Sequence, residues 1–326
     1  MPDEVFLVTG ASGCIGAWVL RRLHEEGIPF VAVDLSDDRR RLGMVLDEDP
    51  TGSGVFITAD ISVPGALNEM VQEHKVTHIV HLAALQIPAC AANPTLGAQV
   101  NVGGTINVFE TIRRMEGRVQ GFCYASSVAA FNGGTDRRKG TTGPSESIPT
   151  TLYGNFKRAV ESIATVYASD HGIGSVGLRP CVVYGPGRDQ GLTSDVSQAM
   201  LAAAGGVRAT VRFSGQTTLQ YAGDVASITI AAARACGGQA LCLDVGGSAV
   251  TMTEVVNVIE EIVPSSAGTI SVTGSPLPFP SVYDPAPLDS LIGRVEYTSL
   301  RLGVESSIER FKALIERGAL VPPTRH

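Results

Sequence analysis

The sequence predicts an α/β fold: a Rossmann-type doubly wound parallel sheet followed by a smaller C-terminal α/β region. Three observations support this prediction. Short apolar segments alternate with helical ones up to about residue 180, a glycine-rich turn follows the first of them, and polar residues stand where several of them end. Because ligands bind such sheets at the carboxyl ends of the strands, these polar residues mark the expected site.

Six parallel strands are predicted by short apolar runs that are bounded by turn residues. They are expected at Val5–Val8, Phe30–Val33, Val55–Ala59, His78–Leu82, Gly121–Ala125 and Ser175–Leu178. Helices are expected between them, the longest at about Cys14–Glu26, Asn93–Met115 and Thr151–His171. Parallel strands joined through helices require right-handed crossovers, which gives the doubly wound arrangement.

The pattern is looser after Pro180. Loops rich in glycine and proline are expected at Tyr184–Gly191 and Pro276–Pro287. Also expected are helices near Val196–Ala204 and Asp224–Ala235, strands near Thr210–Phe213, and a last helix over Ser307–Glu316 with a Ser-x-x-Glu capping box. We therefore expect a Rossmann domain over residues 1–180 that also receives residues 215–245, and a discontinuous substrate-binding region over most of residues 181–326.

The glycine-rich turn after the first strand has the composition of a site for a dinucleotide pyrophosphate. Gly10, Gly13 and Gly16 allow a tight turn, a close approach of the backbone to the phosphates, and close packing of the helix on the strand. The helix that begins at Cys14 and Ile15 offers free N–H groups and a partial positive charge to the anion. The alternative, an ordinary glycine loop, is disfavoured by the strand before the turn and the helix after it.

Asp34 ends the second strand, where a carboxylate accepts hydrogen bonds from the adenosine ribose and repels a 2′-phosphate. This residue favours NAD over NADP. The arginines at 39–41 could serve such a phosphate instead, although a solvated surface run is the simpler interpretation. Asp60 ends the third strand and is expected to face the adenine amino group, with Ile61 against the adenine ring; alternatively, Asp60 is only a turn residue.

Tyr153 and Lys157 are four residues apart and therefore lie on one face of a helix. An ammonium about 5 Å from a phenol, at an effective dielectric near 20, contributes roughly 3 kcal/mol, or about two pKa units. The pKa of Tyr153 is therefore expected to fall, so that the phenol can exchange a proton with a substrate hydroxyl or ketone. Ser127, at the end of the fifth strand, can hydrogen-bond the same oxygen. Taken alone, Tyr153 and Lys157 would be interpreted as a surface pair.

Composition excludes several classes of protein. The formal charge is −7 and the basic residues are scattered, so no nucleic-acid partner is expected. The N-terminus has no secretory pattern, and no apolar run reaches the roughly 20 residues of a membrane span. None of the six cysteines forms a Cys-x-x-Cys pair or a metal-ligand spacing with a histidine. We therefore expect a cytoplasmic protein with reduced thiols, no metal, and a small molecule as its partner.

Together these motifs resemble the extended short-chain dehydrogenase/reductase family, which includes NAD-dependent sugar epimerases and dehydratases. The resemblance covers nearly the whole chain and is carried by Thr9–Gly16, His81–Ala84, Asn101–Thr105, Ala125–Ser127, Tyr153–Lys157, Leu178–Pro180 and Tyr184–Gly187. It implies Ser127, Tyr153 and Lys157 as the catalytic triad, with Lys157 also on the nicotinamide ribose. It further implies cofactor contacts at Leu82, Ala83, Ala84, Pro180 and Val183, with Asn101 supporting the site. A homodimer through the two long helices is implied as well.

The chain departs from its relatives at four positions. Nucleotide-sugar epimerases typically carry an asparagine and an arginine where this chain has Val182 and Thr217, so a buried diphosphate would lack partners. Dehydratases carry an Asp-Glu pair where this chain has Val128 and Ala129, so elimination of water is disfavoured.

A polar loop after the sixth strand supplies the candidate substrate residues Arg188, Thr193 and Ser194, and Gln86 is a further candidate. Arg188 suits a carboxylate; alternatively, it pairs with Asp189 and only stabilises the turn. We expect NAD-dependent oxidation of a secondary hydroxyl of a sugar, sugar acid or related small polyol. Two alternatives stay open: an epimerase of (nucleotide-)sugars that keeps its NADH and returns the hydride, and a non-catalytic protein that senses NAD(P).

Overall fold

The computed structural model describes residues 4–47, 52–131 and 149–322. Its larger sheet has seven parallel strands in the order β10-β6-β5-β4-β1-β2-β3. They are β1 (Phe6–Thr9), β2 (Phe30–Asp34), β3 (Gly54–Thr58), β4 (His78–His81), β5 (Gly121–Ala125), β6 (Ser175–Arg179) and β10 (Ala240–Asp244). This confirms the predicted doubly wound sheet, and the six predicted strands differ from the observed ones by at most one residue at either end.

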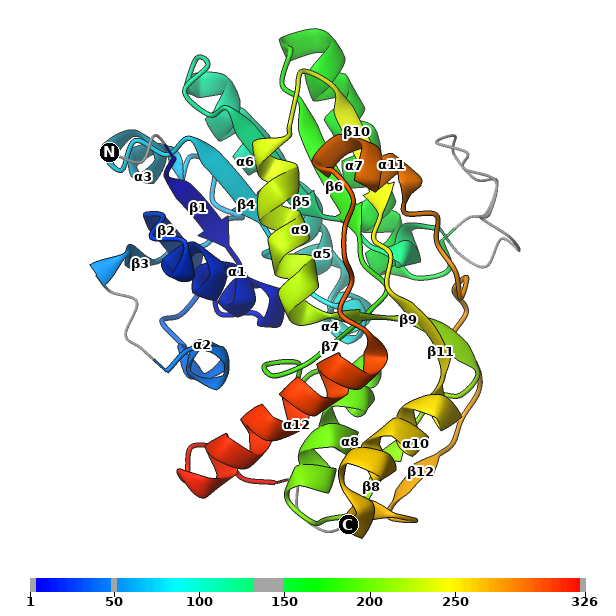
Figure 1. Cartoon of the computed structure of the whole chain (residues 1–326). Coiled ribbons are helices and arrows are strands. Elements are labelled where there is room, and N and C mark those ends of the chain that lie inside the picture. Colours follow the sequence, from blue (N-terminus) through cyan, green and yellow to red (C-terminus); the bar gives the residue numbers. More distant parts are fainter. Residues whose placement is uncertain (1–3, 48–51, 132–148, 323–326) are drawn as a thin grey trace.

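Helices cover both faces of this sheet (Figure 1). They include α1 (Cys14–Glu25), α2 (Arg40–Val45), α3 (Asn68–Glu73), α6 (Gly104–Arg114), α7 (Leu152–His171), α9 (Ala222–Arg234) and α11 (Ala286–Ile292), whereas α4 (Ile87–Ala92) packs on α7. Because alternate residues of a strand point to opposite faces, Phe6 and Val8 pack with α1 and α9, whereas Leu7 packs with α3, α6 and α7. The core therefore has two layers, one on each side of the sheet.

A second unit of small sheets and helices lies below the large sheet in Figure 1. Its elements are β7 (Val182–Tyr184), α8 (Asp195–Ala204), β8 (Ala209–Val211), β9 (Gln216–Tyr221), β11 (Ser248–Thr251), α10 (Met252–Ile262), β12 (Ile270–Val272) and α12 (Leu300–Glu316). Their shared core includes Met200, Phe213, Ile259 and Phe311. Residues 216–221 belong to this unit, whereas α9 and β10 return to the large sheet. The division of the chain into two domains at the predicted boundaries stays a proposal.

Two helices differ from the prediction. The helix expected over Asn93–Met115 is divided into α5 (Pro94–Ala98), a π-helix over Gln99–Gly103, and α6. The last helix begins at Leu300, because Ser299 Oγ accepts a hydrogen bond from the backbone N of Leu302 at 3.4 Å and caps it there. The predicted Ser-x-x-Glu box therefore lies inside α12 and does not cap it.

Candidate functional site

The turn between β1 and α1 leaves room for a pyrophosphate. Gly10 has a φ of +70°, and a Cβ placed there would lie 2.5 Å from the backbone N of Ala83. A Cβ at Gly16 would strike the carbonyl group of Gly10. Gly13 caps α1 without a side chain, so the N–H groups at Cys14 and at the residue after it, Ile15, are open to an anion. The turn fits the pyrophosphate of a dinucleotide.

Asp34 is fixed beside this turn. Its Oδ2 accepts a hydrogen bond from the backbone N of Ser12 at 2.9 Å, and its Oδ1 accepts one from the backbone N of Leu35 at 2.7 Å. A carboxylate oxygen can accept two hydrogen bonds, so both oxygens keep capacity for ribose hydroxyls. The position of Asp34 therefore suits the ribose of NAD.

The arginines at 39–41 do not behave alike. Those at 39 and 40 pair with the carboxylates at 37 and 38 on the surface, in line with a solvated run. The Arg41 side chain is only 15% exposed, pairs with Asp189 at 2.8 Å and donates to the carbonyl oxygen of Ser12 at 3.0 Å. The prediction of a solvated run is thus wrong for Arg41, which joins the glycine turn to the loop after β7.

Two further predicted cofactor segments end at the same edge of the sheet. Asp60 accepts a hydrogen bond from the backbone N two residues later at 2.8 Å, which makes it at least a turn residue. Ile61 is buried against Gly104 at the start of α6. Leu82, Ala83 and Ala84 follow β4 directly, beside the glycine turn. Contacts of these residues with adenine or ribose stay predictions.

Ser127 and Tyr153 meet at the carboxyl end of β5. Ser127 Oγ accepts a hydrogen bond from the backbone N of Ala129 at 3.1 Å, and the same side chain interacts with the Tyr153 phenol and lowers the pKa of that phenol. Thr151 caps α7 by accepting from the backbone N of Gly154 at 3.0 Å, which sets Tyr153 in the first turn of the helix. The two hydroxyl groups that the sequence paired are therefore in contact.

Lys157 lies one turn further along α7. Its Nζ is 5.6 Å from the centre of the Tyr153 ring and donates to the carbonyl oxygen of Ala125 at 2.6 Å. Burial lowers the pKa of Lys157 to about 8, although the neighbouring Cys90 and Glu161 act in the opposite direction. An ammonium has three protons, so two remain for the hydroxyls of a nicotinamide ribose.

The predicted fall in the pKa of Tyr153 is wrong. Burial raises the pKa of Tyr153, because a charged phenolate loses its hydration in this site. The hydrogen bond from Ser127 and the charge of Arg188 act against burial without overcoming it. The cation that lowers the pKa of this phenol is therefore Arg188, whereas the sequence predicts Lys157 in that role.

Asn101 lies in the π-helix, and its side-chain amide forms two hydrogen bonds with the backbone of Leu85. Its Oδ1 accepts from Leu85 N at 2.7 Å, and its Nδ2 donates to Leu85 O at 2.9 Å. A chain of hydrogen bonds leads to it from β1: Thr9 Oγ1 to His81 Nδ1 at 2.6 Å, His81 Nε2 to Thr105 Oγ1 at 3.0 Å, and Thr105 Oγ1 to Asn101 O at 2.8 Å. Because the Thr105 hydroxyl donates its proton to the carbonyl oxygen of Asn101, it can only accept from His81. His81 therefore donates from Nε2 to Thr105 and accepts at Nδ1 from Thr9. This chain fixes the π-helix to the strand that precedes the glycine turn.

Pro180 and Val183 lie at the end of β6 and within β7. The carbonyl oxygen of Pro180 accepts from the backbone N of Val128 at 3.2 Å, which joins β6 to the segment after Ser127. Val182 and Thr217 are 1% and 2% exposed in the core of the smaller unit. Neither side chain is open to a ligand.

Three of the candidate substrate residues converge. Arg188 Nη2 donates to Thr193 Oγ1 at 2.9 Å. A Cβ placed at Gly191 would lie 3.0 Å from Gln86 Oε1 and 3.8 Å from Arg188 Nη2. Ser194 is different: it is 4% exposed and donates to the carbonyl oxygen of Gly191 at 2.7 Å, so it serves its own loop.

The alternative interpretation of Arg188, a local pair with Asp189, is wrong. Asp189 pairs with Arg41 instead. Arg188 therefore forms no ion pair with Asp189.

The sequence did not reveal a buried ionic cluster next to Ser127 and Lys157. Ser126 Oγ donates to Glu161 Oε1 at 2.5 Å, and Arg179 contacts both carboxylate oxygens of Glu161 at 2.7 Å. Glu161 stands one turn after Lys157 on α7, a spacing that is visible in the sequence. Its partners on β5 and β6 are brought to it only by the fold.

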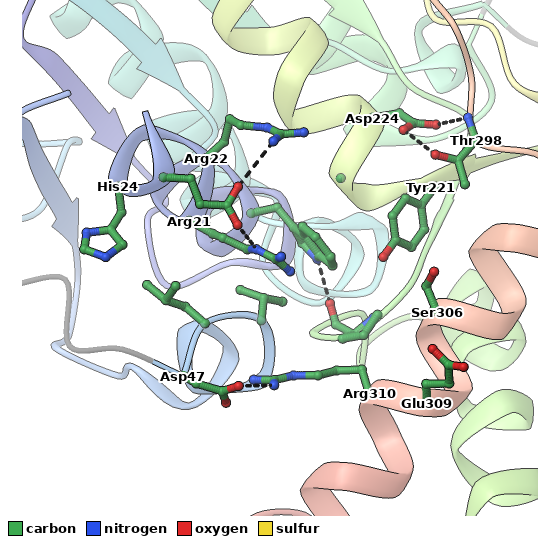
Figure 2. A pocket seen from close by; sticks show the side chains of 16 residues that line it. Arg21, Arg22, His24, Asp47, Tyr221, Asp224, Thr298, Ser306, Glu309 and Arg310 are labelled. Carbon is green, nitrogen blue, oxygen red and sulfur yellow. Dashed lines mark hydrogen bonds and ion pairs between the residues drawn. The ribbon is translucent and has the colours of Figure 1, made fainter. Parts of the chain in front are cut away.

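A separate cleft of about 880 Å³ opens between α1, the end of α2, and α12 (Figure 2). Trp18 lines it and donates from Nε1 to the carbonyl oxygen of Pro186 at 2.9 Å. On its opposite side, Arg310 of α12 pairs with Asp47 at 2.8 Å. Among the described residues that line this cleft, none is a predicted site residue.

Within residues 4–47, 52–131 and 149–322, no helix has the length and apolar character needed to cross a membrane. The same ranges contain no group of three or more His, Cys, Asp or Glu side chains that could hold a metal ion. All six cysteines are free thiols.

Comparison with solved structures supports the fold over almost the whole chain. L-threonine dehydrogenase of Clostridium difficile matches with a TM-score of 0.79 and 19% identity, over 97% of this chain and 99% of that one. UDP-glucose 4-epimerase of Thermus thermophilus, solved with NAD, matches with a TM-score of 0.77 and 24% identity, over 97% and 100%. At these identities the likeness establishes the fold alone.

Sequence relatives match a shorter part. UDP-glucuronate 4-epimerase 3 of Arabidopsis thaliana is 29% identical over 188 residues, which are 55% of this chain and 42% of that protein. An uncharacterised epimerase/dehydratase of Staphylococcus haemolyticus is 29% identical over 54% of this chain and 52% of its own length. The chain thus spans about half the length of these relatives.

A family model gives the assignment. The model of the NAD-dependent epimerase/dehydratase family matches residues 6–240, which hold six of the seven strands of the large sheet, the glycine turn and Ser127, Tyr153 and Lys157. The chain belongs to the NAD-dependent epimerase/dehydratase family, whose cofactor is NAD.

Proposed function

We propose that the protein is an NAD-dependent oxidoreductase that oxidises a secondary hydroxyl of a sugar, sugar acid or related small polyol. The observation that carries this proposal is the position of the Tyr153 phenol, which lies next to the Ser127 side chain and has Lys157 Nζ 5.6 Å from the centre of its ring. A phenol held by a serine and backed by a buried lysine is suited to proton transfer with an alcohol. A purely cofactor-sensing protein would have no use for this arrangement.

The protein residues divide the work. Ser127 holds the substrate oxygen, and Tyr153, as phenolate, takes the hydroxyl proton while the C–O bond becomes a carbonyl. When bound, NAD accepts the hydride of the same carbon and leaves as NADH. Lys157 holds the nicotinamide ribose through its two remaining protons, and Asp34 holds the adenosine ribose. The products balance the substrates as ketone, NADH and one proton released from Tyr153 to solvent.

Two buried side chains support a substrate without a nucleotide. Val182 and Thr217 replace the asparagine and arginine that nucleotide-sugar epimerases typically use, and both are buried in the smaller core. A buried diphosphate needs cationic and amide partners, which these two residues do not offer. We therefore favour release of a free oxidised product over retention of a nucleotide sugar.

An epimerase is the second candidate, and the relatives favour it. UDP-glucuronate 4-epimerase 3 is a sequence relative, and UDP-glucose 4-epimerase shares the fold. The same Ser127, Tyr153 and Lys157 would then act twice, first as base and then as acid, with the intermediate ketone turning in the pocket. In that case NADH would not leave.

We also propose a homodimer through the helix pair α6 and α7, and a reducing compartment such as the cytoplasm. Two apolar residues of α7 are exposed, Leu152 to 43% and Val166 to 53%, and a partner subunit would cover this surface. Six free thiols suit a reducing compartment. Sedimentation velocity of the wild type and a Val166→Glu variant tests the dimer.

The test of the function is NADH formation by the purified protein with a panel of aldoses, uronates, aldonates, polyols and UDP-sugars. Release of NADH with a free sugar or acid, abolished by Tyr153→Phe while NAD still binds, supports the dehydrogenase. A new diastereomer from a UDP-sugar without net NADH would instead mean an epimerase. Unchanged biological function in the Tyr153→Phe variant would mean a sensor.

A further inference from the structure

Arg188 lies between the two halves of the expected site. Its loop packs on the phosphate turn, since a Cβ placed at Gly187 would lie 3.9 Å from the Cα of Cys14. Its charge also reaches the other half, where it acts on the Tyr153 phenol. A group bound by Arg188 would therefore lie within electrostatic range of the Tyr153 phenol.

The guanidinium of Arg188 has unused donors. Nη2 donates to Thr193 Oγ1 at 2.9 Å, but Nε is buried and has no hydrogen-bond acceptor within the described part of the chain. No described carboxylate pairs with Arg188, because the neighbouring Asp189 is held by Arg41 at 2.8 Å. A buried cationic N–H without an acceptor is costly, so native proteins keep one chiefly where a ligand completes it.

The side-chain amide of Gln86 converges on the same place. Its Oε1 lies 3.0 Å from a Cβ placed at Gly191, and Arg188 Nη2 lies 3.8 Å from that point. The amide nitrogen beside Oε1 is the donor that a carboxylate would use. No described residue forms a hydrogen bond with the Gln86 side-chain amide, which is exposed at the start of α4. Gln86 and Arg188 thus present an amide and a guanidinium edge to one position.

We propose that Arg188, aided by Gln86, binds a carboxylate carried by the substrate close to the hydroxyl that Tyr153 deprotonates. The inference rests on the proposed function and narrows its substrate class to hydroxy acids, such as aldonates or uronates. A planar carboxylate matches the parallel N–H groups of a guanidinium, whereas a neutral hydroxyl would leave the charge unpaired. The pyrophosphate of NAD is the other anion within reach, but the open N–H groups at the start of α1 already suit it.

The experiment compares each acid with its neutral counterpart, an aldonate with the matching polyol and a uronate with the matching aldose. In the wild type we expect kcat/KM for the acid to exceed that for the neutral compound by about 100-fold, the ratio that a charged hydrogen-bonded contact supports. Arg188→Gln should remove most of this preference through the KM of the acid. Arg188→Lys, which keeps the charge but not the parallel N–H groups, should keep only part of it.

The matched control is Arg301→Gln on α12, since Arg301 is 58% exposed in a surface pair with Glu261. It should keep the full preference for the acid. Thermal unfolding of each variant checks that Arg188→Gln is folded. Equal kcat/KM for acid and neutral compound in the wild type would overturn the proposal. So would a weaker Kd of NAD in Arg188→Gln with the acid preference intact, because the anion would then be the pyrophosphate.

The two proposals fail in different ways. If no compound gives NADH in a Tyr153-dependent manner, the proposed oxidation is wrong. Binding of the acids can still be measured by thermal shift in the presence of NAD, and stabilisation by an acid that Arg188→Gln abolishes would support the carboxylate site on its own. Absence of that stabilisation would reject it.

Discussion

Glu161 accepts a hydrogen bond from Ser126, the residue immediately before Ser127. Three successive turns of α7 therefore hold three successive residues of the chain at the end of β5. Tyr153 lies next to Ser127, Lys157 Nζ donates to the carbonyl oxygen of Ala125 at 2.6 Å, and Glu161 accepts from Ser126. The distance between Ser127 and Tyr153 is thus set by the position of the whole helix α7 along strand β5.

Glu161→Gln should weaken the attachment of α7 to the end of β5. The Arg179 guanidinium, which contacts both oxygens of Glu161 at 2.7 Å, would lose its main partner in a buried site. Breaking a buried pair from one side costs about 3 kcal/mol, so urea unfolding should report a loss of that order. We also expect a lower kcat with little change in the Kd of NAD, because Asp34 and the glycine turn are not involved.

The control for that variant is Glu309→Gln on the exposed face of α12, which should leave both quantities unchanged. Replacing Glu161 and Arg179 together by methionine should recover part of the stability, since both charges of the pair are removed and only the 3.5 Å contact of Arg179 with Asp244 is lost. Equal stability of the single variant and the wild type would show that solvent reaches the cluster.

Lys157→Met should give a more stable but inactive protein at pH 7. Burial lowers the pKa of Lys157 from 10.5 to about 8, which corresponds to a cost of roughly 3 kcal/mol for keeping it charged. Losing its hydrogen bond to Ala125 costs about 1 kcal/mol, so a net gain of about 2 kcal/mol is expected.

The pH dependence of that gain follows from the sign of the shift. Between pH 8 and pH 10.5 the unfolded chain binds the proton that the folded protein has released, so wild-type stability rises with pH. The difference between Lys157→Met and the wild type should therefore shrink over this range in urea titrations. Lys312→Met, at an exposed position of α12, provides the control, and a variant less stable than the wild type at pH 7 would contradict the assigned cost.

The sequence predicted the large sheet well because its strands are local apolar runs with turn residues at their ends. It also placed Ser127 and Tyr153 correctly, since both follow recognisable elements. The π-helix could not be predicted in this way, because Asn101 is held by the backbone of Leu85 and by Thr105, contacts that exist only after folding. The pKa of Tyr153 was misjudged for the same reason: charge is visible in a sequence, but burial is not.

His81 should make the protein sensitive to acid. Burial, aided by the charge of Lys157, lowers the pKa of His81 from 6.5 to about 3. Below pH 6.5 the unfolded chain takes up a proton that the folded protein refuses, so stability falls as pH falls. Between pH 6.5 and pH 5 this histidine alone accounts for about 2 kcal/mol.

Urea unfolding at pH 7, 6 and 5 measures this slope. His81→Gln is expected to be less stable at pH 7, because it cannot bridge Thr9 and Thr105 as the imidazole does, but its stability should depend less on pH. His171→Gln, at the exposed end of α7, should keep the wild-type slope. If the free energy of unfolding of His81→Gln falls as steeply between pH 7 and pH 5 as that of the wild type, other groups cause the loss of stability in acid.

Arg188 should also set the pH at which the enzyme works. Burial raises the pKa of Tyr153, and the hydrogen bond from Ser127 and the charge of Arg188 oppose this rise. Oxidation needs the phenolate, so log kcat/KM should increase with pH until Tyr153 is ionised. Removing the cation in Arg188→Gln raises the pKa of Tyr153 further and should move the rising part of the pH profile, called the basic limb below, to higher pH.

The measurement of this pH profile uses the neutral substrate, so that loss of carboxylate binding does not affect the result. Arg301→Gln should show the wild-type profile. If the basic limb of Arg188→Gln lies at the same pH as in the wild type, Arg188 acts only in binding. If it moves to lower pH, the electrostatic argument for Tyr153 is contradicted.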